Sequence, residues 1–236
     1  MTALTAQGMT VSFGGVHAVV DVDLEVAEGR LVGLIGPNGA GKTTFIDAIT
    51  GFVRSRGRVV LGGEDLSRLA PHERARRGLA RTWQAIELFD DLTVGENVAV
   101  AASDQSQEAL ELVGLDPAVA GKMPSQLSQG ERKLAGVARA LAAKPRVVCL
   151  DEPAAGLDST ESELLGKRLR TVVGGGTGML LVDHDMSLVL SVCDHIVVLE
   201  FGKVIARGSP DEVRRDRRVV EAYLGSTGAE RVAEQL

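Results

Sequence analysis

The chain has 236 residues, 44% of them apolar and 25% charged, which suits one large folded domain or two small ones with an ample core. Lys and Arg total 26 against 32 Asp and Glu, and the net charge of −6 argues weakly against a nucleic-acid binder, as do aromatic residues at only 3%. No apolar run reaches the ~18 residues of a membrane-spanning helix, so the sequence predicts no span across a bilayer.

The N-terminus and the cysteines indicate where the protein works. The N-terminus lacks the basic and then apolar segment of a signal peptide, and this predicts a cytoplasmic protein. Cys149 and Cys193 each lie among apolar residues and lack metal-ligand spacing. We therefore expect both cysteines to be buried as small hydrophobic side chains.

Short strands separated by turns are expected over residues 4–35. Residues 18–26 alternate as a half-buried strand does, and residues 31–35 form the apolar run of a buried parallel strand. Phe13 stands near the end of the first strand. From its spacing alone, we favour a core aromatic at this position.

A glycine-rich loop follows the 31–35 strand and matches the phosphate-binding pattern GxxxxGKT. After it, Phe45, Ile46 and Ile49 are spaced for one helical face. The order of strand, loop and helix that a phosphate-binding loop requires is therefore present. This order disfavours the alternative, a glycine-rich turn that binds nothing. Glycines let backbone N–H groups turn onto phosphate oxygens at the positive end of the helix. Lys42 can reach the β- and γ-phosphates, and the Thr43 hydroxyl can bind Mg²⁺. The expected nucleotide-binding residues are Gly36, Pro37, Asn38, Gly39, Ala40, Gly41, Lys42, Thr43 and Thr44.

A clear helix opens after residue 128, beyond a short strand at 57–61, a basic helix at 71–77 and a mixed helical region. Its apolar residues recur at intervals of three and four and include Val137 and Leu141. Ser128 fits two roles equally well. It is either a plain helix cap or a group at a helix N-terminus that attracts an anion.

Two carboxylates follow the next buried strand, which begins near Val147. Asp151 and Glu152 stand at the carboxyl end of this strand, where α/β sheets place ligand chemistry. Asp151 fits the acid that holds Mg²⁺ in P-loop enzymes, and Glu152 fits a general base that orients the attacking water. A solvated acidic turn is the less favoured alternative.

A histidine ends a further buried strand at 179–182, which follows an amphipathic helix at 159–173. A lone histidine is usually structural, but His184 stands at a strand end beside the other strand-end acids, which makes it a better candidate for the site. A strand pair is expected from Ile196 to Arg207. The arginines of the last helix predict a solvated face rather than a binding patch; they are Arg214, Arg215, Arg217 and Arg218.

Together these motifs resemble the ATP-binding subunit of ATP-binding cassette (ABC) transporters, over residues 4–225, with 226–236 as a C-terminal tail. The phosphate loop is complete, and LSQGE stands where that family has its signature, usually LSGGQ. By this resemblance, the signature residues are Leu127, Ser128, Gln129, Gly130 and Glu131, and Asp158 belongs to the D-loop that follows the acid motif. His184 matches the switch histidine, Phe13 the aromatic that stacks on adenine, and Gln84 the glutamine that joins catalysis and Mg²⁺ binding.

The resemblance implies an α/β fold with a P-loop NTPase core of ABC type, an N-terminal antiparallel β subdomain and an inserted helical subdomain at about 85–142. It implies ATP and Mg²⁺ as cofactors. It also implies that two such subunits face each other, each ATP lying between one P-loop and the partner's signature, and that they drive membrane permease subunits from the cytoplasmic face of the membrane. An importer would also use a substrate-binding protein, and no nucleic-acid partner is expected.

Within the family, the sequence is most similar to the ATPases of branched-chain amino-acid importers. The likeness is carried by GLARTWQ at 78–84, LTVGEN at 92–97 and EAYLG at 221–225. Urea or amide importers and the lipopolysaccharide-export ATPase look similar, so several substrates fit. Gln129 and Glu131 depart from the usual signature, and the segment at 100–107 is short.

Two other functional classes compete with a transport motor. A cassette protein of DNA repair or translation would be expected to carry a long coiled-coil insertion or a second cassette, and this chain has neither. A degenerate cassette would bind ATP without hydrolysing it, as a regulator. The presence of Lys42, Asp151, Glu152 and His184 argues against that alternative.

Overall fold

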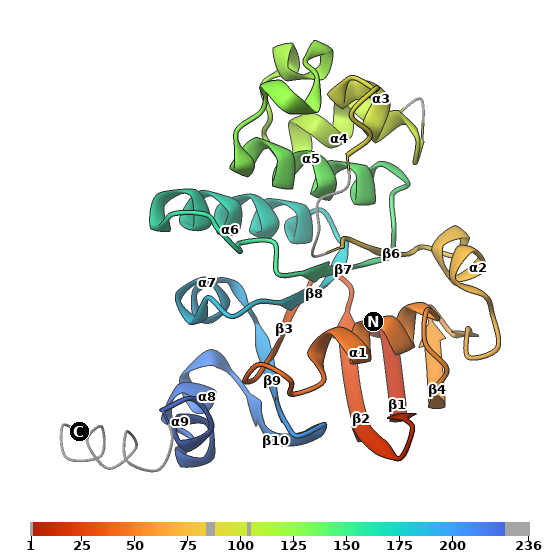
Figure 1. Ribbon diagram of the computed structural model, residues 1–236, viewed down its shortest axis with the longest axis vertical. Coiled ribbons are helices and arrows are strands. Elements are labelled where there is room, and N and C mark those ends of the chain that lie inside the picture. Colours follow the sequence, from red (N-terminus) through yellow and green to blue (C-terminus); the bar gives the residue numbers. More distant parts are fainter. Residues whose placement is uncertain (1, 84–87, 103–104, 225–236) are drawn as a thin grey trace.

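Two β-sheets form the centre of the computed structural model, which describes residues 2–83, 88–102 and 105–224 (Figure 1). The strands are β1 (Thr2–Phe13), β2 (Val16–Ala27), β3 (Leu31–Ile35), β4 (Arg56–Leu61), β5 (Glu64–Asp65), β6 (Leu79–Arg81), β7 (Val147–Asp151), β8 (Gly178–Val182), β9 (His195–Glu200) and β10 (Lys203–Gly208). A four-stranded antiparallel sheet has the order β2-β1-β4-β5. A six-stranded sheet has the order β10-β9-β3-β8-β7-β6, and all of its strands are parallel except β10.

The strand patterns explain which sheet each strand joins. All residues of β3, β7 and β8 are buried, as expected for continuous apolar runs with layers on both faces. β2 instead alternates buried and exposed side chains along its second half. The expected α/β core with an N-terminal antiparallel sheet is therefore confirmed.

Helices cover both faces of the larger sheet and one end of the molecule. They are α1 (Lys42–Thr50), α2 (Pro71–Arg76), α3 (Val94–Ala99), α4 (Ser106–Leu112), α5 (Gln129–Ala142), α6 (Ser159–Gly174), α7 (Met186–Val192), α8 (Pro210–Arg215) and α9 (Arg217–Leu224), with 3₁₀ helices η1 (Pro117–Gly121) and η2 (Pro124–Gln126). The helix α1 packs Phe45, Ile46 and Ile49 into a core shared by both sheets. A second core joins the opposite face of the larger sheet to α5, α6 and α7.

The helices α3, α4 and α5 gather at one end, above α6 in Figure 1. Reciprocal capping begins four helices, because a Ser, Thr or Asp at the N-cap and a Glu three residues later each bond the other's backbone N–H. Within α3, the fully buried Asn97 accepts from Phe89 N and donates to the carbonyls of Phe89, Leu92 and Thr93. This side chain fixes the loop that leads into the helical region.

The expectations for the two cysteines and for the arginines of the last helix are confirmed, whereas the last helix itself differs from the expected one. Cys149 and Cys193 are buried as expected, and burial raises the pKa of both thiols. The expected last helix is two helices, because Asp216 ends α8 and its carboxylate accepts from Arg218 N to start α9. The four arginines there are exposed, as predicted.

Among the described residues, no helix is both long and apolar enough to cross a membrane.

Candidate active site

The glycine-rich loop leads from the end of β3 into α1 and takes a shape that requires glycine. Gly36, Gly39 and Gly41 have φ of 150°, 79° and 103°, which side-chain-bearing residues rarely adopt. A Cβ on Gly36 would lie 2.1 Å from Leu199 O, and one on Gly41 would lie 2.3 Å from Ala18 O. Gly41 is the N-cap of α1, and no side chain caps this helix. The first N–H groups of α1 are therefore available to an anion.

Lys42 lies at the centre of this loop. Its side chain folds back so that Nζ donates to the Gly36 carbonyl at 2.7 Å and to the Pro37 carbonyl at 3.0 Å. Burial lowers the pKa of its ammonium, while Glu152 and Asp151 oppose that shift. The loop thus holds a cation next to its own free N–H groups, which is a pairing suited to phosphate.

Asp151 ends β7 and lies beside the start of α1. Its Oδ1 accepts from the Thr43 hydroxyl at 3.4 Å, and its backbone N–H donates to the Thr82 hydroxyl. The other oxygen, Oδ2, is buried and has no hydrogen-bond partner among the described residues. Burial raises the pKa of Asp151, and the Arg81 guanidinium acts against that rise. A buried carboxylate oxygen that accepts no hydrogen bond, next to a hydroxyl, is the hard-oxygen donor set that fits Mg²⁺.

Glu152 and His184 meet where β7 and β8 end side by side. Glu152 has φ 50°, its N–H donates to Val182 O at 2.7 Å, and its carbonyl accepts from Lys133 Nζ. His184 Nδ1 lies 4.0 Å from Glu152 Oε2 and 3.7 Å from Asp183 Oδ1. A carboxylate beside an imidazole at a strand end can take and return a proton.

The segment 127–131 begins α5. The Ser128 hydroxyl accepts from Glu131 N, and Ser128 N donates to the Glu131 carboxylate at 2.8 Å, so the capping role of Ser128 is present. The Ser128 N–H is the largest cause of a lowered Glu131 pKa, and Lys122 Nζ lies 3.9 Å from this carboxylate. A hydroxyl that accepts from a backbone N–H keeps its own proton to donate, so both readings of Ser128 are compatible.

The segment 127–131 packs on the stretch after Glu152 in its own chain. A Cβ on Gly156, at φ 77°, would lie 2.5 Å from Gln129 Nε2, and one on Gly130 would lie 3.1 Å from Glu161 Oε1. Asp158 caps α6 by accepting from Glu161 N at 2.9 Å. In the part of the chain that the structure describes, residues 127–131 form no hydrogen bond with the chain's own P-loop.

Phe13 is half exposed, at 52%, so the expectation of a core aromatic is wrong. Its side chain stands at the end of β1, opposite Val16 across the hairpin. The second strand of this hairpin reaches the loop, because Ala18 O closely approaches Gly41. Phe13 is therefore an exposed aromatic on a hairpin next to the P-loop. Gln84 lies outside the described residues.

If adenine rests on Phe13, the Phe13→Ala variant should bind ATP more weakly by about 0.5–1.5 kcal/mol, because a stacking surface is lost. The melting temperature of the nucleotide-free protein should barely change, because this side chain is exposed. Calorimetric titration and thermal melts measure the two effects, and Val16→Ala on the same hairpin is the control. A fall of several degrees with unchanged ATP affinity would assign Phe13 to packing.

Sequence reasoning missed several charged residues that support this site. Asp183 is fully buried, and its carboxylate accepts from Ala154 N and Asp185 N. The buried Arg74 donates to the carbonyls of Ala48 and Ile49 at the end of α1. Its position in a basic surface helix gave no signal of this role. Lys133 is buried on α5 beside its apolar side chains. A charged residue next to an apolar helix face was the available signal that it has a partner in the interior.

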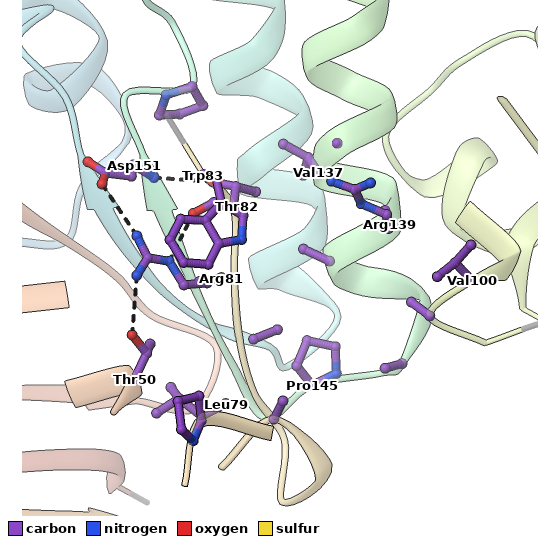
Figure 2. A pocket seen from close by; sticks show the side chains of 18 of the residues that line it. Thr50, Leu79, Arg81, Thr82, Trp83, Val100, Val137, Arg139, Pro145 and Asp151 are labelled. Atoms are coloured by element: carbon purple, nitrogen blue, oxygen red, sulfur yellow. Dashed lines mark hydrogen bonds and ion pairs between the residues drawn. The ribbon is translucent and has the colours of Figure 1, made fainter. Parts of the chain in front are cut away.

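A groove of about 940 Å³ opens beside Asp151 and Glu152, between β6, α2, α5 and the loop before α3 (Figure 2). Three partly exposed aromatic side chains line it, namely Phe52, Trp83 and Phe89. Arg76 and Arg139 also line it. The sequence offered no sign of this groove, because its walls come from segments far apart in the chain.

Comparison with known proteins gives consistent matches. The profile described as ABC transporter matches residues 19–155, and the profile described as branched-chain amino acid ATP-binding cassette transporter matches residues 203–229. The high-affinity branched-chain amino acid transport ATP-binding protein BraF of Pseudomonas aeruginosa is 36% identical, covering 94% of this chain and 97% of its own. The lipopolysaccharide export system ATP-binding protein LptB of Haemophilus influenzae is also 36% identical, covering 95% and 98%.

Solved structures of cassettes superpose on the chain. The ADP conformation of MJ1267, an ATP-binding cassette of an ABC transporter, has a TM-score of 0.89 at 28% identity and covers 96% of this chain and all of its own. The dimeric post-hydrolysis structure of the cassette MJ0796, bound to ADP and Pi, has a TM-score of 0.77 at 25% identity and covers 88% and 98%. The fold described above is thus that of these cassettes.

Proposed function

This chain belongs to the ABC transporter family, whose ATP-binding subunits hydrolyse ATP, and we propose that it drives an importer of branched-chain or other amino acids. The observation that carries the motor role is the convergence of Lys42, Asp151, Glu152 and His184 at the carboxyl edge of one sheet. The match of residues 203–229 to a branched-chain amino-acid profile supports the substrate class.

The phosphates of ATP are held by the start of α1 in this proposal. Its free N–H groups and the Lys42 ammonium bind the phosphate oxygens. The hydroxyl of Thr43 and the carboxylate of Asp151, together with Gln84, would hold Mg²⁺. When bound, this ion offsets the negative charge on the transferred phosphoryl group.

Hydrolysis itself falls to the strand-end pair. Glu152 orients a water molecule and takes its proton, and its backbone is fixed by the bonds to Val182 and Lys133. His184 lies 4.0 Å from this carboxylate, and in this proposal it hydrogen-bonds at the same reacting centre. We assign the catalytic roles to Glu152, His184 and Gln84.

A second ATP-binding subunit completes each site in this proposal. The post-hydrolysis MJ0796 cassette is a dimer with ADP and Pi, and the fold here superposes on it. We assign Leu127, Ser128, Gln129, Gly130, Glu131 and Asp158 to the partner subunit's ATP. The start of α5 offers N–H groups to an anion but does not bond its own P-loop among the described residues. Glu131 adds a negative charge that the usual Gln lacks, so we expect weaker attraction for the γ-phosphate here.

We propose that a membrane permease subunit docks in the groove of Figure 2. Its exposed aromatics favour apolar side chains, and Arg76 and Arg139 favour a carboxylate, so an amphipathic acidic segment of the permease fits. Such docking would hold this subunit at the cytoplasmic face of the membrane. An importer would further require a substrate-binding protein.

A lipopolysaccharide-type exporter is the second candidate, because identity to LptB equals that to BraF. A related urea or amide importer is a further alternative. A non-transport regulator fits less well, because Lys42, Asp151, Glu152 and His184 are all present and placed together.

Deleting the gene in its native host and measuring uptake of labelled leucine, isoleucine and valine tests the substrate class. We expect uptake to fall and to return with the wild-type gene but not with Glu152→Gln. Labelled urea and acetamide uptake, and the amount of surface lipopolysaccharide, are followed in parallel. Unchanged amino-acid uptake with a defect in one of these would replace the proposed substrate.

A further inference from the structure

The guanidinium of Arg81 joins the P-loop helix to the carboxylate assigned to Mg²⁺. Arg81 ends β6, and its side chain is only 7% exposed. Its NH1 group donates to Asp47 Oδ1 on α1 at 2.5 Å and lies 3.4 Å from the Thr50 hydroxyl. Its NH2 group lies 3.7 Å from Asp151 Oδ2, the oxygen that has no hydrogen bond among the described residues (Figure 2).

The same guanidinium lies over two aromatic rings that line the groove. Its Cζ lies 3.8 Å from the centre of the Trp83 ring and 5.4 Å from that of Phe52. The two rings meet edge to face, with centres 4.7 Å apart and planes at 79°. Trp83 and Phe52 are 44% and 50% exposed and line the groove. The Arg81 side chain therefore contacts the aromatic wall of the groove on its flat face and approaches Asp151 with its NH2 group.

We propose that Arg81 is a positioning residue that couples the Mg²⁺ site at Asp151 to the aromatic wall of the groove. This inference rests on the proposed function, because it takes Asp151 as a metal ligand and the groove as the site where the permease docks. When Asp151 shares its charge with a metal ion, its attraction for Arg81 weakens, while Asp47 continues to hold the other side of the guanidinium. The guanidinium then changes its position relative to the ring of Trp83, on which it stacks.

The coupling acts in both directions. A partner segment that repacks Trp83 and Phe52 moves the guanidinium, and so moves the carboxylate that it holds. By thermodynamic linkage, the factor by which Mg²⁺ changes the affinity for this segment equals the factor by which the segment changes the affinity for Mg²⁺. Lysine cannot replace arginine here, because only the planar guanidinium stacks on an indole while it bonds the Asp47 carboxylate and pairs with that of Asp151.

The chain contains one tryptophan, so Trp83 itself reports the effect. The purified wild-type protein is saturated with ATP in EDTA and then titrated with Mg²⁺ while tryptophan emission is followed. We expect a saturable change in emission that is absent when Mg²⁺ is added without ATP. Calorimetry gives ATP binding in the same samples. A flat emission signal alongside normal Mg²⁺·ATP binding would overturn the inference and leave the proposed function standing, whereas absence of ATP binding would overturn the proposed function.

Two variants test whether the signal runs through the guanidinium. In Arg81→Lys the emission change should fall by about threefold or more, while the Mg²⁺ midpoint should move by less than about threefold, because charge is kept and stacking is lost. The control is Arg77→Lys, whose parent residue pairs with Glu64 on the surface, and it should respond as wild type does. A full response in Arg81→Lys would contradict the proposal. The wild-type titration remains decisive if that variant does not fold.

Discussion

Replacing Glu152 by Gln is expected to slow ATP hydrolysis by about 10²–10⁴-fold while leaving ATP binding nearly intact. The amide keeps the size of the side chain but cannot accept a proton. The backbone bonds of residue 152 to Val182 and Lys133 do not involve its side chain, so the local fold should persist. ATP should therefore remain bound and hold two subunits together, and size-exclusion chromatography with ATP should show an ATP-dependent dimer.

The matched control for this variant is Glu163→Gln, because Glu163 is an exposed carboxylate that pairs only with Lys167 among the described residues. Turnover in the control should equal that of the wild type. Undiminished turnover in Glu152→Gln would remove Glu152 from the mechanism, and the proton acceptor would have to be sought elsewhere.

Replacing Lys42 by Ala should weaken ATP binding by at least about 100-fold, because charge-assisted bonds to two phosphates are lost. The change also leaves the carbonyls of Gly36 and Pro37 without the donor that they have in the nucleotide-free chain. We therefore expect the melting temperature without nucleotide to fall as well. Calorimetric titration with ATP and a thermal melt separate the two effects.

Lys144→Ala is the matched control for the lysine, since Lys144 is exposed and pairs with Glu108 far along the sequence from the loop. It should bind ATP normally. Near-normal ATP affinity in Lys42→Ala would refute the assignment of residues 36–44 as the phosphate-binding loop.

The core of the fold and most of the candidate site were predictable from sequence because their signals are local. β3, β7 and β8 are apolar runs, and each is followed at once by the residues that matter, namely the loop ending in Lys42, the pair Asp151 and Glu152, and His184. Parallel strands in one sheet bring their carboxyl ends to one edge. A motif placed directly after such a strand therefore reaches the site wherever the strand lies in the sheet.

Exposure, neighbours and the groove were decided only by the tertiary structure. Phe13 is a large aromatic residue of the kind that usually packs in a core. The end of its hairpin lies outside the packed layers, however, and this leaves its ring half exposed. Arg81 lies within the stretch GLARTWQ at 78–84, which showed a family likeness but gave no sign of the contacts that this side chain makes. Its importance arises because β6 is the edge strand beside β7, which puts its guanidinium between Asp47, Asp151 and Trp83. The contacts with Asp47 and Asp151 join segments that are far apart in the chain. No periodicity or spacing encodes them, because strand order in a sheet depends on the packing of all layers at once.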